Sequence, residues 1–375
     1  MSAAHLSAAP STDWRQFVPG PVPTPPHLLS LGAAQLPYNR TETFSTITHE
    51  ILDGLNELFR TKGRTAVITG SGTAAMEAAV FNFVGTADRA LVVNGGTFGQ
   101  RWVDLCVSLE IPHDELAVEF GAELDMASLE AALSSGQYTA LLINAHETST
   151  GHLYNIEAIG ALARQHQAFF IVDAISSVCA DPFEMDAWHV DVAILGSQKA
   201  LALPPGLAFV AMGERALARL ESDRSRPKSL YFNLRSYLEN QKRGQLPFTP
   251  AIGVMIQLHA RLKDIREQSL TALILQHQRR AESFRHAVRD MAFDIFPACS
   301  SNAMTTLSCR ERDASEVAAE LQNRYHLIVA PSGGELKSKV IRISHMGDQD
   351  PADVRRLVSA LGEINAGTQK GNIQL

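Results

Sequence analysis

The stretch VDVAILGSQKALALPPGLAFVAM, residues 190–212, contains two short apolar runs on either side of a single lysine, Lys199. Continuous runs rich in Val, Ile and Leu are typical of strands that are buried on both faces, as in parallel sheets. We therefore predict strands at 190–196 and 206–212. Lys199 directly follows the first of them and precedes small residues and prolines, which is an unusual setting for a surface lysine.

The same alternation of apolar runs and amphipathic stretches extends upstream. Four further runs predict strands: TAVITG (65–70), ALVVNG (90–95), TALLINA (139–145) and AFFIVDA (168–174). Helical patterns cover residues 45–59, 73–83, 99–110 and 155–167. Strands that alternate with helices predict a wound α/β domain with a mostly parallel sheet.

The pattern changes downstream of Pro250, where one long helix is expected to reach about Met291. Beyond it, the expected elements of a small α+β domain are strands near 303–309 and 340–343 and helices near 314–325 and 351–364. The proline-rich stretch FVPGPVPTPP (17–26) predicts an extended lead-in, because each proline fixes its own φ. We therefore expect three parts: an N-terminal extended segment (1–44), a large domain (45–260), and a long linking helix with a small C-terminal domain (261–375).

Composition and charge exclude several classes of protein. The chain has 375 residues, of which 45% are hydrophobic and 19% charged, as expected of a soluble globular protein with a sizeable core. Its net charge of −7 leaves no basic stripe for nucleic acid. No apolar run reaches the roughly 18 residues of a membrane span, and the first fifteen residues lack the pattern of a signal peptide.

The four cysteines, Cys106, Cys179, Cys299 and Cys309, form no CxxC pair. We therefore expect no disulfide framework and no metal site, and a reducing cytoplasm as the location.

Lys199 and Asp173 are the main candidates for chemistry. A lysine whose pKa is lowered by burial or by a neighbouring cation can form a Schiff base with a carbonyl cofactor. Asp173 ends the apolar run of IVDAISS, where a carboxylate needs a cation or strong donors. A protonated pyridine nitrogen would serve, because the facing carboxylate keeps such a ring electron-withdrawing. The alternatives are a solvated charge at a strand end for Lys199 and a helix N-cap for Asp173.

TGSGTAAMEA, residues 69–78, lies between a predicted strand and a predicted helix. Free backbone N–H groups and the helix dipole make such a loop a phosphate seat, to which hydroxyls add donors. A plain turn explains the loop equally well. No Gly-Lys-Ser/Thr follows, which argues against a nucleotide-binding P-loop.

Six motifs in one order resemble the class V aminotransferases, which are pyridoxal-phosphate-dependent transferases of fold type I. They are SGT (71–73), NGGTFGQRW (94–102), HETSTG (146–151), VDAISS (172–177), GSQKALALPPG (196–206) and RISHMGD (342–348). The resemblance spans roughly residues 17–365 and is closest to the alanine-glyoxylate and serine-glyoxylate type, with 2-aminoethylphosphonate–pyruvate transaminases nearby. It implies an α/β large domain on a mostly parallel seven-stranded sheet, a smaller C-terminal α+β domain, the cofactor pyridoxal 5′-phosphate, and a homodimer with shared active sites.

The resemblance also implies roles for single residues. Lys199 would bind the cofactor as a Schiff base and then move the substrate α-proton, while Asp173 would pair with the pyridine nitrogen. The resemblance further implies that Phe98 would stack on the cofactor ring, that Thr148 would contact the ring oxygen, and that Thr249 would reach the phosphate of the neighbouring subunit. The residues that would bind the phosphate in the same subunit are Ser71, Gly72, Thr73 and Gln198.

Arg342 matches the arginine that binds the substrate carboxylate, for which its planar fork is suited. The alternative is a surface arginine on an edge strand. Gly20 matches a backbone donor near the same carboxylate. The sequence departs from the family at YNRTETF (38–44), where many relatives carry a His-Arg-Ser run, so the role of Arg40 is open. The roles of His146 and His345, which flank the expected site, are open as well.

These residues predict a ping-pong transamination between a small amino acid of the alanine or serine type and a small 2-oxo acid, glyoxylate or pyruvate, through pyridoxamine phosphate. One alternative is a 2-aminoethylphosphonate donor with pyruvate, which would need extra basic or hydroxyl donors at the entrance. A second is a pyridoxal-phosphate lyase such as a cysteine desulfurase, which needs a nucleophilic cysteine on a mobile loop. A cofactor-binding regulatory domain is a third, although neither end of the chain carries a helix-turn-helix pattern.

Overall fold

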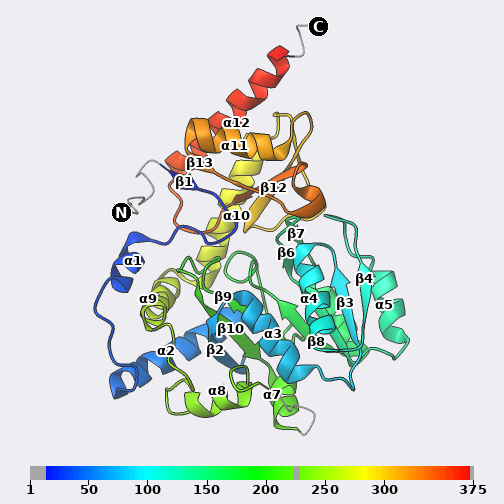
Figure 1. The fold of residues 1–375 in the computed structure, drawn as a ribbon, viewed down its shortest axis with the longest axis vertical. Helices are drawn as coiled ribbons and strands as arrows, with labels where there is room; N and C mark the ends of the chain where they lie inside the picture. Colours follow the sequence, from blue (N-terminus) through cyan, green and yellow to red (C-terminus); the bar gives the residue numbers. More distant parts are fainter. Residues whose placement is uncertain (1–13, 223–228, 372–375) are drawn as a thin grey trace, which may run out of the picture.

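The computed structural model describes residues 14–222 and 229–371, which form a large part and a smaller part stacked upon it (Figure 1). The large part is built on a seven-stranded sheet with the order β2-β10-β9-β8-β5-β3-β4. Its strands are β2 (Arg64–Gly70), β3 (Ala90–Asn94), β4 (His113–Ala117), β5 (Ala140–Asn144), β8 (Phe169–Asp173), β9 (Val192–Gly196) and β10 (Gly206–Met212). All neighbours are parallel except β10, which is antiparallel to both β9 and β2.

The central strands are buried along their whole length, as their unbroken apolar runs predict. Helices cover the sheet, and they are α2 (Glu42–Phe59), α3 (Gly72–Phe83), α4 (Thr97–Ser108), α5 (Met126–Ser134), α6 (Ile156–Gln165), α7 (Glu214–Glu221) and α8 (Leu234–Gln241). The six strands predicted in this part are confirmed, each with ends within two residues of those expected. The seven-stranded, mostly parallel sheet is confirmed as well.

Helix α2 shows how the local sequence sets an element. The Thr41 hydroxyl accepts a hydrogen bond from the backbone N–H of Phe44 (3.2 Å) and so caps the first turn. Ile51, Leu55 and Leu58 then recur at helical spacing and are buried against the sheet. The helix ends at Phe59, because the next residue, Arg60, adopts a left-handed conformation.

The smaller part has its own four-stranded sheet in the order β11-β12-β15-β14. Its elements are β11 (Phe293–Ile295), β12 (Met304–Cys309), α11 (Ala314–Tyr325), β14 (Ala330–Pro331), η1 (Gly334–Leu336), β15 (Val340–Ser344) and α12 (Pro351–Gly371). A separate hydrophobic core, which includes Phe284, Leu321 and Leu357, holds these elements together.

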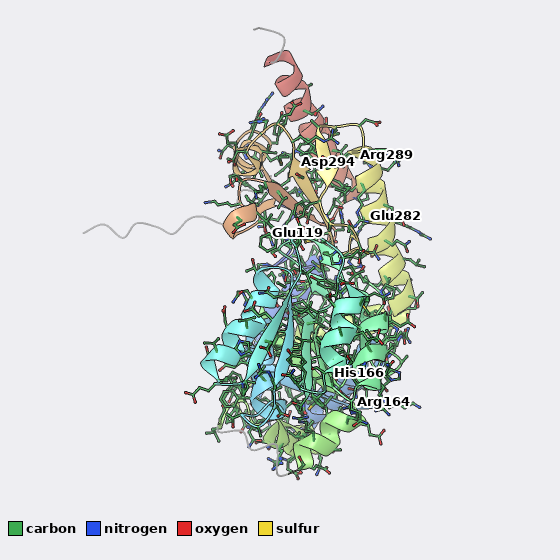
Figure 2. The ribbon with its side chains drawn as sticks, turned by 90° about the vertical axis from the view of Figure 1, so that its right-hand side faces the viewer. Glu119, Arg164, His166, Glu282, Arg289 and Asp294 are labelled. Carbon is green, nitrogen blue, oxygen red and sulfur yellow. The ribbon has the colours of Figure 1, made fainter. Side chains whose placement is uncertain are left out.

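One long helix after Pro250 was expected, and this prediction was wrong. The segment forms two helices, α9 (Ile252–Gln268) and α10 (Leu270–Ala287), which break at Ser269. Ser269 has a φ of 72°, and its hydroxyl accepts from the backbone N–H of Ala272 (3.2 Å), so it starts a new helix. Helix α9 packs on the large part, whereas α10 rises beside the smaller part (Figure 2).

The N-terminal lead-in joins the two parts. Strand β1 (Arg15–Gln16) pairs with β13 (Leu327–Ile328) of the smaller part, and the N–H of Ser344 donates to the carbonyl of Phe17 (2.7 Å). The N–H of Val22 donates to the carbonyl of Gln198 in the large part (3.2 Å). A short helix that the sequence did not predict, α1 (Pro26–Gly32), then packs on α9. Residues 1–13 of the expected N-terminal segment lie outside the described residues.

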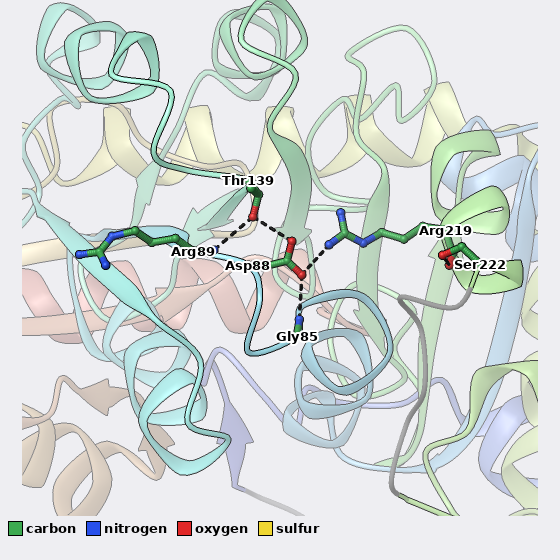
Figure 3. Close-up of polar contacts among 6 residues, drawn as sticks. All are labelled: Gly85, Asp88, Arg89, Thr139, Arg219 and Ser222. Atoms are coloured by element: carbon green, nitrogen blue, oxygen red, sulfur yellow. Dashed lines mark hydrogen bonds and ion pairs between the residues drawn. The ribbon is translucent and has the colours of Figure 1, made fainter.

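A buried carboxylate fastens the amino ends of the parallel strands (Figure 3). Asp88 accepts hydrogen bonds from the N–H of Gly85 (2.9 Å), from the hydroxyl of Thr139 (2.9 Å) and from Arg219 (2.7 Å). Burial alone would raise the pKa of Asp88, but the bonds from Gly85 and Arg219 bring it below its ordinary value. The cluster ties the loop before β3 to the start of β5 and to α7.

Replacing Asp88 with asparagine should lower the free energy of unfolding by about 2–4 kcal/mol, because Arg219 loses its buried partner. A depressed carboxyl pKa contributes stability above the ordinary value of 3.8, and this contribution is lost as the pH falls through the folded-state pKa. The difference in the free energy of unfolding between the wild type and Asp88→Asn should therefore be largest at neutral pH and should shrink below about pH 4. Denaturant unfolding at pH 7 and pH 3.5 measures it, and an equal gap at both values would contradict the assignment.

Candidate active site

Nine of the residues named in the sequence analysis meet in one cavity of about 230 Å³. They are Ser71, Gly72, Thr73, Phe98, His146, Thr148, Asp173, Gln198 and Lys199, and the further lining residues are Arg101, Ile175 and Ser176. The segments that carry these residues follow the carboxyl ends of the parallel strands, where ligands bind in open α/β sheets. In Figure 2, Glu119, which follows β4, lies at the junction with the smaller part, whereas His166, which precedes β8, lies well away from that junction. The cavity therefore opens between the two parts.

The side chain of Lys199 is half-buried in this cavity, and its Nζ donates a hydrogen bond to the carbonyl of Pro19 (2.6 Å). Burial lowers the pKa of Lys199 to about 8, and the positive charge of Arg342 acts in the same direction. A substantial neutral fraction is thus present near physiological pH, as a nucleophilic amine requires. The alternative of a solvated charge at a strand end is excluded.

Asp173 is the last residue of β8 and is also buried. Its carboxylate accepts from the side chain of Asn144 (2.8 Å) and from the N–H of Ile175 (2.8 Å). Burial raises the pKa of Asp173 to about 6. No helix begins in the turns that follow it, so the alternative of a helix N-cap is wrong. The site would favour a cation facing this carboxylate.

The loop after β2 presents the start of α3 to the cavity. Ser71 is the N-cap residue, but its hydroxyl makes no capping bond, and the first N–H groups of a helix have no partner within it. A Cβ on Gly72 would come within 2.3 Å of the end of the Ile175 side chain, so a larger residue would force Ile175 to move. The free N–H groups at the start of α3 and the helix dipole make an anion seat. The Oε1 of Gln198, an acceptor, is buried nearby without a hydrogen-bond partner.

Two loops that carry aromatic and hydroxyl groups are tied together by Glu147. Its carboxylate accepts from the N–H groups of Phe98 (3.2 Å) and Gly99 (2.9 Å), at the first turn of α4. The neighbouring Thr148 donates its hydroxyl to Ser176 (2.9 Å). The ring of Phe98 and the hydroxyl of Thr148 are thus held at fixed places in the cavity wall.

His146, whose role the sequence left open, also lines the cavity. It stands in β6 (His146–Glu147), which pairs with β7 (His152–Leu153). Its Nδ1 lies 2.9 Å from the carbonyl of Ser176, so Nδ1 carries the proton, and the buried Nε2 has no partner. Burial lowers the pKa of His146 to about 4. The ring is therefore neutral and offers Nε2 as an acceptor.

Arg342 and Gly20 lie beside the cavity. Arg342 stands in β15, and its two terminal nitrogens donate to the carbonyls of Thr148 and Pro331 (3.0 Å each), while its Nε is buried without a partner. Burial lowers the pKa of Arg342 to about 10. A Cβ on Gly20 would come within 2.7 Å of the Nζ of Lys199, and its φ of 141° also favours glycine.

Three further residues from the sequence lie outside the cavity. Thr249 is exposed, two residues before Ala251, whose N–H donates to the hydroxyl of Thr69 (3.0 Å). Arg40 is exposed and donates to the side chain of Gln245 and to a carbonyl. His345 is buried in the smaller part beside Thr305, and burial lowers its pKa well below the ordinary value.

Arg101, Ile175 and Ser176 line the cavity but were not singled out in the sequence. Arg101 stands three residues after Phe98 in a helix, and this spacing places both on one face. Ile175 and Ser176 lie in the motif VDAISS, next to Asp173. The positions of all three residues within these motifs could therefore have identified them from the sequence. The described residues contain no cluster of three or more His, Cys, Asp or Glu side chains suited to a metal ion, and within them no helix is long and apolar enough to cross a membrane.

The chain is similar to known proteins over most of its length. A serine–glyoxylate aminotransferase of Arabidopsis thaliana is 31% identical over 344 residues, which cover 88% of this chain and 85% of that protein. The small subunit of a soluble hydrogenase of Synechococcus sp. is 31% identical over 357 residues, or 93% and 92% of the two chains. The crystal structure of an alanine–glyoxylate aminotransferase from Nostoc sp. has a TM-score of 0.91 at 26% identity and covers 96% of this chain and 97% of its own. Residues 33–357 match the family Aminotransferase class-V, and the chain belongs to this family.

Proposed function

We propose that this enzyme transfers an amino group between a small amino acid of the alanine or serine type and a small 2-oxo acid, glyoxylate or pyruvate, with pyridoxal 5′-phosphate as cofactor. The observation that carries the proposal is a half-buried lysine, Lys199, in the same cavity as a buried carboxylate, Asp173. Similar proteins named as serine–glyoxylate and aspartate–glyoxylate aminotransferases support the choice of substrates.

The chemistry of the lining residues fits pyridoxal phosphate. Lys199 offers an amine to its aldehyde, Asp173 a carboxylate to its ring nitrogen, and the start of α3 an anion seat to its phosphate. The unpartnered Oε1 of Gln198 and Nε2 of His146 leave polar atoms for further contacts. When bound, the cofactor supplies an electron sink that stabilises negative charge at the substrate α-carbon.

The protein's own residues would handle the proton and the substrate carboxylate. The Nζ of Lys199 accepts the proton from the α-carbon and returns it, for which a pKa near the working pH is suited. Asp173 keeps the ring nitrogen protonated. The guanidinium of Arg342 exchanges its carbonyl partners for the substrate carboxylate, beside the backbone of Gly20. Because donor and acceptor both carry this carboxylate, Arg342 serves both half-reactions.

The structure gives less support to the alternatives. Arg40, the basic residue that could bind a phosphonate, is engaged outside the cavity. None of the four cysteines lines the cavity, and burial raises the pKa of Cys106 to about 11 and that of Cys179 to about 12, which disfavours a nucleophilic thiolate. All four thiols are free, which supports a reducing cytoplasm as the location.

A half-reaction screen tests the proposed function. L-Alanine or L-serine, added alone to the cofactor-loaded enzyme, should convert the absorption spectrum to that of pyridoxamine phosphate, and glyoxylate or pyruvate should restore it. Conversion by 2-aminoethylphosphonate but by neither amino acid would favour the phosphonate alternative. A spectrum that no amine changes, while the enzyme still releases an oxo product, would favour a lyase.

A homodimer with shared sites is also proposed, with Thr249 reaching the phosphate seat of the neighbouring subunit. Large apolar side chains are exposed in the elements near Thr249, and they are Leu29, Leu36, Tyr38, Leu230 and Tyr231. Tyr231 stacks on Phe248 and donates its hydroxyl to the carbonyl of Thr69, next to the phosphate loop. Exposed apolar side chains of this kind mark association surfaces.

Mixed dimers should reveal the sharing. Thr249→Glu places a negative charge beside the neighbour's phosphate, so this variant and Lys199→Ala should each be inactive alone. When the two are co-expressed, the mixed dimer should regain one intact site and about half of the wild-type activity per dimer, because Lys199 and Thr249 of that site come from different chains. Activity is measured after purification of the doubly tagged mixed dimer. A mixed dimer that stays inactive would place Thr249 in its own subunit's site, and a Thr249→Glu variant that is active alone would place Thr249 in no site.

A further inference from the structure

Arg101 is a cation in the cavity wall that the proposed function leaves without a role. It stands in the first turns of α4, and its Nη1 donates to the hydroxyl oxygen of Thr73 (2.9 Å). Its guanidinium carbon lies 4.8 Å from the centre of the Phe98 ring. Within residues 14–222 and 229–371, its recorded partners are this hydroxyl and this ring rather than a carboxylate. The positive charge of Arg101 is therefore directed toward the cavity without being neutralised by an ion pair.

The contact with Thr73 determines what that hydroxyl can do. A hydroxyl group has one proton and two lone pairs, and the bond from Arg101 occupies a lone pair. The proton of Thr73 remains available to an acceptor in the cavity, and the adjacent guanidinium makes it a stronger donor. Ser71 and Gly72 lie beside Thr73 at the start of α3, so this donor belongs to the anion seat.

A phosphate that enters this seat brings up to two negative charges into a half-enclosed site. Burial of such charge costs free energy unless a cation compensates for it. The amine of Lys199 is bonded to the carbonyl of Pro19. Arg342, which belongs to the smaller part, donates to the carbonyls of Thr148 and Pro331. Arg101 is the arginine that contacts the phosphate loop through a recorded hydrogen bond. Its charge also acts within the cavity, because it lowers the pKa of both Lys199 and Asp173.

We propose that Arg101 is a positioning residue for the cofactor phosphate, which it acts on through the hydroxyl of Thr73 and through its charge, and that it makes the site select the phosphorylated cofactor. This inference rests on the proposed function, since it takes pyridoxal phosphate as the ligand. The ring of Phe98 holds the guanidinium in place by a cation–π contact. Arg101 thus links the ring-stacking residue to the phosphate seat.

The experiment compares two ligands that differ only in the phosphate group. Apo-protein is titrated with pyridoxal 5′-phosphate and with pyridoxal, and binding is followed by equilibrium dialysis and by the visible absorption of the bound form. Arg101→Gln should weaken the binding of pyridoxal phosphate roughly 10- to 100-fold, as expected for the loss of a charged hydrogen-bonding partner, and should leave the binding of pyridoxal within about twofold of wild type. The affinity of Arg101→Lys for pyridoxal phosphate should lie between those of the wild type and Arg101→Gln, because lysine keeps the positive charge but lacks the planar guanidinium.

Two further variants make the result specific. Arg279→Gln removes an exposed arginine of α10 and should change neither affinity. Phe98→Leu should weaken the binding of pyridoxal, which Arg101→Gln leaves nearly unchanged, and should weaken pyridoxal phosphate at least as much, because the ring also holds Arg101. Thermal unfolding of each apo-protein confirms that the variants fold.

Equal weakening of both ligands by Arg101→Gln would overturn the proposal, because Arg101 would then act on the ring through Phe98. Unchanged affinity for pyridoxal phosphate would overturn it as well. Failure of the wild-type apo-protein to bind pyridoxal phosphate would instead refute the proposed function, and this inference with it. The two failures are therefore distinguished by the wild-type titration alone.

Discussion

Replacing Lys199 with alanine should abolish the visible absorption of the cofactor-loaded protein and reduce turnover by roughly 10³-fold or more. The variant loses both the amine that binds the cofactor aldehyde and the base that moves the α-proton. A positioned base alone contributes about 10²- to 10⁴-fold to the rate. Absorption spectra of the purified variant and its steady-state rate with the best donor from the half-reaction screen measure the two effects.

Two controls separate chemistry from charge. Lys199→Arg keeps a cation but has no nucleophilic amine, so it should lose the absorption as completely as the alanine variant. Lys337→Ala removes an exposed lysine and should behave like wild type. If Lys199→Ala retained the absorption band, the assignment of this lysine would be wrong.

Replacing Asp173 with asparagine should reduce kcat by about 10²- to 10⁴-fold, which corresponds to the roughly 3–5 kcal/mol that a buried ion pair loses when one partner is removed. Asparagine keeps the shape but cannot hold a proton on the facing ring nitrogen by charge. The cofactor should still bind, because Lys199 and the phosphate seat are intact. Steady-state rates and the retained visible absorption together test this prediction.

Asp191 offers a matched control for Asp173. Burial raises the pKa of both carboxyls to about 6, but Asp191 lies at the amino end of β9, where it accepts from the N–H of Phe170 and from Arg215. Asp191→Asn should therefore affect stability and leave kcat within a few-fold of wild type. An equal loss of kcat in both variants would show that the Asp173 effect is structural.

The pH dependence of stability gives a further check on Asp173. A carboxyl whose folded-state pKa is raised from 3.8 to about 6 opposes folding once the pH exceeds its ordinary value, because the unfolded chain ionises more readily. The apo-protein should therefore lose part of its stability between about pH 4 and pH 6. Asp173→Asn should lose less, because Asp191, whose pKa burial also raises to about 6, still opposes folding in this range. An equal loss of stability in both proteins would contradict the raised pKa of Asp173.

The central strands could be predicted from the sequence because they are buried on both faces and read as unbroken apolar runs. Strand β4 was missed, since HDELA at 113–117 is a half-exposed edge strand with charged side chains. The break at Ser269 was missed because both helices beside it carry helical patterns, and one serine with a positive φ decides where the chain turns. Such a conformation depends on tertiary packing rather than on local pattern.

The candidate site was predictable to the extent that its residues stand at strand ends within short motifs. The contact between Lys199 and Pro19 joins residues 180 positions apart, and no local pattern encodes it. The side chain of Arg342 likewise reaches across from the smaller part to Thr148, a contact that depends on how the two parts dock. The place of Thr249 depends on a second chain, and it stays a prediction.

The lead-in of residues 17–22 has a practical consequence for anyone who handles this enzyme. Phe17 is bonded to the sheet that carries Arg342, Pro19 to the reactive amine, and Val22 to the loop that carries this amine. Deletion of residues 17–22 would therefore remove backbone contacts on both sides of the cavity. Helix α12 ends far from the catalytic centre (Figure 1), which makes the carboxyl terminus the safer place for any fusion.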